Sequence, residues 1–175
     1  MQNEKIKIKN QGFTLLLSLL VISVILSVSF GVFDVMTKEL KLSGLGRESQ
    51  IAFYAADAGI ECAYFWDIKK KEFDDAIKND RGFSIKCAGK DMVGGISGNG
   101  SLSEPYTLNF NFDMGEDATQ KCAEVTVGKV ITQEDGFKKT TTTIQSKGYN
   151  YWCKSSSPHK VERAIRVVST KTEKI

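Results

Sequence analysis

The stretch Gly12–Phe33 reads GFTLLLSLLVISVILSVSFGVF, and it decides the architecture of this chain. It holds no charged residue, and Leu, Val, Ile and Phe dominate it. About 20 apolar residues are what one helix needs to cross roughly 30 Å of hydrocarbon. The four serines in the stretch can return their hydroxyl hydrogen bonds to the preceding helical turn. The stretch therefore predicts a membrane-spanning helix.

The residues on either side of this stretch predict its orientation. The preceding segment, MQNEKIKIKNQG (1–12), carries Lys5, Lys7 and Lys9 against a single acid, Glu4, and the first acid after the stretch is Asp34. Positively charged flanks stay on the cytoplasmic side of a membrane. We therefore expect a single-pass protein of the inner, or cytoplasmic, membrane whose C-terminal head lies outside.

The junction before the apolar stretch has a more specific interpretation. An ordinary secretory signal carries a small-residue cleavage site after its apolar region, but nothing of that kind follows Phe33. Gly12-Phe13-Thr14-Leu15 instead resembles the type III signal of type IV pilins. The resemblance implies that a prepilin peptidase cuts after Gly12 and methylates the new N-terminal residue, Phe13. The alternative is an uncleaved signal anchor of an unrelated single-pass protein.

Two further features refine this resemblance. The stretch 50–61, QIAFYAADAGIE, is similar to the AF-AAEA stretch of PilX-type minor pilins, so the likeness covers roughly residues 10–65. Most major pilins carry Glu at the fifth mature position, where this chain has Leu17. The resemblance therefore implies a minor pilin-like structural subunit of a type IV pilus. Its implied partners are other pilin subunits, the prepilin peptidase and the pilus assembly platform, and its place after assembly is a surface filament.

Two alternatives to a pilus subunit stay open at this point. A pseudopilin of a type II secretion or DNA-uptake system shares all the motifs quoted above. A signal-anchored surface binding protein or enzyme of another class would share only the apolar stretch and its basic flank.

The expected organisation has four parts. They are a leader peptide (1–12), a transmembrane and filament-core helix (13–33), an amphipathic extension of that helix (34–68) and a globular head (69–175). The glycine-containing stretch 43–46, SGLG, is where we expect a kink or local break, because each glycine costs about 1 kcal/mol in a helix. An apolar stripe at helical spacing should seat the extension on the head. It comprises Leu45, Ala52, Phe53, Ala56, Ile60, Ala63 and Tyr64.

The spacing of apolar residues along the sequence changes within the head. Residues 69–80 predict a short polar helix with Phe73, Ala76 and Ile77 facing inward, and 89–103 is glycine-rich and reads as a loop. Apolar and polar residues then alternate as they do in half-buried strands. The strands expected are 83–87, 106–112, 123–131, 138–146 and 160–170, with a turn at 134–136. The sequence thus predicts an α+β fold, in which a long N-terminal helix packs on an antiparallel sheet as in pilin heads.

The four cysteines, Cys62, Cys87, Cys122 and Cys153, are an even number in a domain placed outside the membrane. This usage favours disulfides. If strands 123–131 and 138–146 form a hairpin about Asp135, Cys122 lies opposite roughly Gly148 and near Cys153. We therefore favour Cys122–Cys153, with Cys62–Cys87 joining the end of the long helix to the first strand. Where the exterior is not oxidising, all four would be buried thiols.

Composition argues against several other functions. The net charge is +3, of which the leader holds +2 (three Lys, one Glu), so the mature chain is close to neutral and offers no electrostatic case for nucleic acid. The basic C-terminal run from Lys160 to Lys174 reads as the solvated face of an edge strand. No nucleophile stands with a base, so we expect no enzyme and no cofactor. We expect no metal either, because there is no C-x-x-C, one His, and a cluster at Asp113, Glu116 and Asp117 that reads as a solvated turn.

Overall fold

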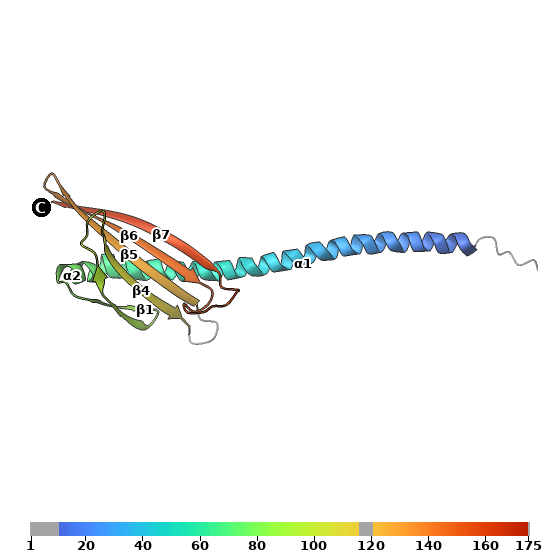
Figure 1. Ribbon diagram of the computed structural model, residues 1–175, viewed down its shortest axis with the longest axis horizontal. Coiled ribbons are helices and arrows are strands. Elements are labelled where there is room, and N and C mark those ends of the chain that lie inside the picture. The colour runs from blue at the N-terminus through green and yellow to red at the C-terminus, as the bar shows by residue number, and fades with distance from the viewer. Residues whose placement is uncertain (1–10, 116–120, 175) are drawn as a thin grey trace, which may run out of the picture. The chain divides into compact units, whose positions relative to one another are not determined.

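A computed structural model of the chain describes residues 11–115 and 121–174. It has the α+β architecture that the sequence predicts, with one long N-terminal helix that packs on antiparallel sheet (Figure 1). Residues 1–10 of the expected leader lie outside the described part. The chain forms two units, of which the first ends at Leu45 and the second, the head unit, begins at Gly46.

The long helix α1 runs from Gln11 to Tyr64 and passes directly into a π-helical turn, η1 (Phe65–Lys69). The break expected at residues 43–46 is wrong, because the helix continues through them. An added Cβ at Gly44 or Gly46 would meet no atom within 4 Å, so no packing forces the chain to turn there. Helix propagation adds a hydrogen bond with each residue and outweighs the small cost of two glycines. The boundary between the two units nevertheless falls within this stretch.

Within residues 46–115 and 121–174, the head unit has a short helix, α2 (Glu72–Lys78), and seven strands in two antiparallel sheets. The smaller sheet pairs β1 with β2, and the larger has the order β3-β4-β5-β6-β7. The strands are β1 (Phe83–Cys87), β2 (Lys90–Gly94), β3 (Ile96–Ser97), β4 (Tyr106–Met114), β5 (Lys121–Glu134), β6 (Phe137–Tyr149) and β7 (Glu162–Lys174). β7 lies at the edge of its sheet and exposes Arg166, Lys171 and Lys174, as expected for the basic run, whereas Lys160 precedes β7 and is half-buried.

The five strands predicted from alternation are all present, but the loop expected at 89–103 is wrong in part. The chain turns at Ala88-Gly89 and returns as β2, which pairs with β1, and Ile96–Ser97 forms β3. The glycine content of this segment misled the prediction because Gly94 serves packing. A Cβ at Gly94 would collide with the ring of Phe83 on the paired strand.

The hairpin of β5 and β6 forms the centre of the larger sheet. Its two-residue loop is Asp135-Gly136, with φ values of 50° and 76°, the positive pair that a type I′ turn requires. The turn predicted from Asp135-Gly136 is therefore confirmed. In the resulting register, Cys122 faces Tyr149, one residue from the expected Gly148.

The head end of α1 packs on the larger sheet through small residues (Figure 1). The buried positions of this part of the helix are Ala52, Ala55, Ala56, Gly59, Ile60 and Ala63. A Cβ on Gly59 would meet Ser146 and Val125, and a Cβ on Gly148 would meet the backbone of Ala56. Helix and strands therefore approach more closely than large side chains would allow.

The stripe predicted for this helix is confirmed at Ala52, Ala56, Ile60 and Ala63 and wrong at its other three members. Phe53 and Tyr64 are 49% and 44% exposed, and Leu45 is 58% exposed. The close approach at Gly59 and Gly148 leaves little space between helix and sheet, and the two aromatic residues face away from it.

A cluster of phenylalanines fills the other side of the core. Phe73 of α2 makes an edge-on contact with Phe83 of β1 at 5.5 Å between ring centroids, and Phe83 makes another with Phe110 of β4 at 6.1 Å. Phe73 and Ala76 are buried as expected, whereas Ile77 is half-buried. The cluster joins α2, the small sheet and the large sheet into one core.

The close approach of helix and sheet gives a first prediction. Gly148→Ala should lower the free energy of unfolding by about 2–3 kcal/mol, because the added methyl would meet backbone atoms of Ala52 and Ala56, which cannot rotate away. Thermal unfolding of the full chain in detergent, followed by circular dichroism, measures this loss. Gly128→Ala on the adjacent strand is the matched control, since its Cβ would come no closer than 3.8 Å to the Thr143 carbonyl. Equal melting of the two variants would contradict the packing described.

Candidate functional site

The apolar segment of α1 is the most unusual surface of the described chain. Every residue from Phe13 to Phe33 is exposed, and Phe13, Leu15 and Phe30 are at least 68% exposed. Single exposed apolar residues are common on proteins, but a continuous apolar surface of this kind marks a site of interaction with a membrane or a partner. Among the described residues, one helix is long and apolar enough to cross a membrane, a criterion that a signal sequence also meets.

The serines of this segment bond within the helix, as predicted. Ser18 donates to the Leu15 carbonyl at 2.8 Å, Ser23 to Leu20 at 2.8 Å, Ser27 to Ser23 at 2.9 Å and Ser29 to Ile25 at 2.8 Å. Polar groups in lipid must be satisfied within the protein, because hydrocarbon offers them no partner. These hydroxyls therefore place no obstacle to burial of the segment in an apolar medium.

The residues of the expected processing junction lie at the start of this segment. Gly12 and Phe13 are the second and third residues of α1. The side chain of Phe13 is 72% exposed, and that of Leu17, where major pilins carry Glu, is 51% exposed. Cleavage and methylation at this junction stay predictions.

The four cysteines form the two pairs that the sequence favoured. Cys62 of α1 pairs with Cys87 at the end of β1, with 5.9 Å between their Cα atoms. Cys122 of β5 pairs with Cys153, which follows β6, at a Cα separation of 5.2 Å. Both separations lie in the usual range for disulfides. One pair joins the long helix to the small sheet, and the other joins the start of β5 to the segment between β6 and β7.

One group of potential metal ligands surrounds the second disulfide. Asp113 lies beside Cys122 and Cys153. The two sulfurs are bonded to each other, so neither is a thiolate ligand, and the Asp113 carboxylate instead accepts a hydrogen bond from the Cys153 amide at 3.2 Å. Glu116 and Asp117, the other acids of the turn considered above, lie outside the described residues.

A buried lysine is the principal feature that the sequence analysis missed. Lys129 of β5 points its amine at the carboxylates of Asp67 in η1 and Asp74 in α2, and forms an ion pair with each. The side chains of Lys129 and Asp67 are only 2% and 3% exposed, whereas that of Asp74 is 49% exposed. Burial raises the pKa of Asp67, and the neighbouring Lys129 opposes that rise. One buried cation thus faces a buried carboxylate and a half-exposed one.

The sequence carried a signal for this lysine. Val125, Val127 and Lys129 occupy alternate positions of β5 and therefore share the face that the helices cover. A lysine on the buried face of a strand requires a partner, because burying an unpaired charge is costly. The partners could not be predicted, since Asp67 and Asp74 lie more than fifty residues earlier and approach only in the folded head unit.

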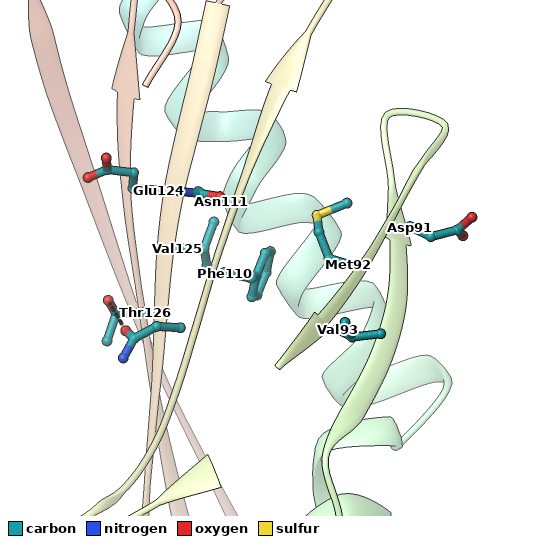
Figure 2. Close-up of a pocket in the computed structure, with 9 residues that line it drawn as sticks. Asp91, Met92, Val93, Phe110, Asn111, Glu124, Val125 and Thr126 are labelled. Carbon is teal, nitrogen blue, oxygen red and sulfur yellow. Dashed lines mark hydrogen bonds between the residues drawn. The ribbon is translucent and has the colours of Figure 1, made fainter. Parts of the chain in front are cut away.

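A cavity of about 550 Å³ lies between the small sheet and the large one. Figure 2 shows Asp91, Met92 and Val93 of β2 on one side and residues of β4 and β5, among them Phe110 and Glu124, on the other. Two of its lining residues are bonded to each other, since Thr126 donates a hydrogen bond to the Asn109 side chain at 2.8 Å.

Comparisons of the chain with protein-family models, with curated protein sequences and with solved structures gave no match. The likeness to pilins therefore depends on the N-terminal motifs and on the architecture described above.

The two disulfides give a second prediction. Peptide mapping without reduction should recover Cys62 joined to Cys87 and Cys122 joined to Cys153. The double variant Cys122→Ser/Cys153→Ser should lose about 3–4 kcal/mol of unfolding free energy, because the bond closes a loop between residues 31 apart. The variant Cys62→Ser/Cys87→Ser, with a separation of 25, should lose a similar amount. Recovery of any crossed pair, or melting unchanged by both variants, would contradict the structure.

Proposed function

We propose that this chain is a minor pilin-like structural subunit that works by assembly through its N-terminal helix. The observation that carries the proposal is the segment Phe13–Phe33. It is uncharged, helical and exposed throughout, and it begins directly at the Gly12-Phe13 junction. An apolar helix of this length needs either lipid or neighbouring helices around it.

In this proposal the same helix serves two environments in turn. Before assembly it crosses the membrane, with the lysine-bearing leader in the cytoplasm and the head outside. After a prepilin peptidase has cut at Gly12-Phe13, the assembly platform transfers the helix into a bundle of helices from other pilin subunits. The transfer exchanges one apolar environment for another, so its cost is small compared with exposure of the segment to water.

The residue at position 17 supports a minor role. In major pilins the corresponding Glu is thought to pair with the N-terminal amine of a neighbouring subunit, and a membrane-embedded carboxylate is retained only where it has a function. Leu17 cannot make that pair. We therefore propose a sparse or terminal place in the filament. A pseudopilin in a secretion or DNA-uptake system would use the helix in the same way, and the filament in which the subunit is found separates the two.

The head in this proposal is displayed on the filament and has no enzymatic activity. The near-neutral charge of the mature chain argues against capture of nucleic acid. Two disulfides and a core of packed phenylalanines suit a domain that works outside the cell.

Identification of the N-terminal residue of the mature protein tests the proposed function. The protein should be recovered from the membranes of the cells that naturally produce it, and the mass of its N-terminal peptide determined. We expect a chain that begins at N-methylated Phe13 and is a sparse component of purified filaments. The variant Gly12→Val should keep the leader, because the resemblance assigns the cleavage to this glycine.

The control for this experiment is Gly31→Ala. Gly31 lies in the same helix with no atom within 4 Å of an added Cβ, so the variant should be processed normally. A wild-type chain that keeps Met1 in its producing cells would exclude the proposed function.

A further inference from the structure

The buried ion-pair cluster of Asp67, Asp74 and Lys129 has features beyond those of a structural salt bridge. Lys129 lies in the centre of the large sheet, opposite Tyr106 of β4 and Thr142 of β6. Its amine lies against carboxylates from two different elements, η1 and α2. A lysine in such a position is held by the sheet, while its partners belong to the helical layer.

The two carboxyl groups that contact the amine differ in their exposure to water. Lys129 Nζ donates a hydrogen bond to Asp74 Oδ1. It also forms an ion pair with Asp67 Oδ1. The amine thus lies against both carboxyl groups, of which Asp67 is buried and Asp74 is half-exposed. This is the placement expected of a base and an electrophile around one nucleophile.

Burial favours the protonated form of Asp67, which is the reactive one. An ammonium beside a carboxylate and an amine beside a carboxylic acid differ only by the transfer of one proton. Removal from water penalises the charged form of a carboxyl group. Burial raises the pKa of Asp67, which acts in this direction.

We propose that Lys129 Nζ and the carboxyl carbon of Asp67 condense into an intramolecular isopeptide bond, with Asp74 as the proton carrier. The lone pair of the neutral amine attacks the carboxyl carbon of the protonated Asp67. Asp74 accepts a proton from the nitrogen and returns it to the departing hydroxyl group, which leaves as water. One C–N bond forms, one C–O bond breaks, and no oxidant or reductant is required.

The position of Asp74 suits this role. Its side chain is 49% exposed, so it reaches the buried amine at one end and the solvent at the other. It can therefore exchange protons with water and give the product water a way out. General acid–base assistance of this kind contributes roughly a hundredfold or more to a rate.

The bond would close a gap in the covalent connections of the head unit. The disulfide of Cys62 joins α1 to β1 in the small sheet, and that of Cys122 joins β5 to Cys153. Neither joins the helix to the large sheet. An amide between Asp67 and Lys129 would do so, at the end of the helix and in the central strand. The inference stands on this geometry and does not depend on assembly into a filament.

Mass spectrometry of the full-length chain tests the inference. After denaturation and reduction, the wild-type mass should be lower than the mass of the sequence by one water molecule. Trypsin should then release the peptide Glu48–Lys69 joined to Cys122–Lys138, with Lys129 uncleaved inside it. Lys129→Arg, which keeps the positive charge but has no primary amine, should show the full mass and no joined peptide, as should Asp67→Ala.

Two further variants separate the roles. Asp74→Asn should form the bond roughly a hundredfold more slowly, because the proton carrier is gone. Lys147→Arg is the matched control, since Lys147 pairs with Glu162 on the surface at 3.6 Å, and it should retain the loss of water. A wild-type chain of full mass, cleaved by trypsin after Lys129, would overturn the inference. Normal bond formation in Asp74→Asn would overturn the role given to that residue.

Discussion

The structure depends on one constraint: the apolar surface of residues 13–33 must be kept from water. In the first unit the described residues form a single helix, which has no second element of its own unit to pack against. All of its side chains from Phe13 to Phe33 are exposed, and its serines bond back to the helix backbone. Such a segment is stable only in lipid or against other helices. The structural role proposed for this chain, assembly through its N-terminal helix, follows from the need to keep this segment from water.

The head unit is arranged to hold the other end of the same helix. Ala52, Ala56 and Gly59 let the helix lie close to the sheet, and Gly148 of β6 allows that approach from the opposite side. Beyond this contact, Cys62 joins the helix to β1, and Lys129 joins η1 and α2 to β5 through paired charges. Buried pairs of charge are weak evidence of stability, because desolvation offsets their attraction. Their value here lies in bringing a nucleophile and a carboxyl group together.

The sequence predicted what local pattern determines. The apolar helix, the alternating strands and the Asp135-Gly136 turn depend on residues close in the chain, and the pairing of Cys122 with Cys153 followed from the hairpin that this turn makes. Features set by distant contacts were missed. Gly94 was assigned to a loop although it makes room for Phe83, and Phe53 was assigned to the core although it faces away from the sheet. The partners of Lys129 likewise depend on how η1, α2 and β5 meet.

Partition between membrane and water tests the central claim most directly. Membranes that contain the full-length chain should be washed with alkaline carbonate, and the distribution of the chain compared with that of a variant that begins at Asp34. The account predicts that the full chain stays in the membrane pellet and leaves it only with detergent, whereas the shortened chain is released in soluble form. A full-length chain that remains a soluble monomer without detergent would contradict it.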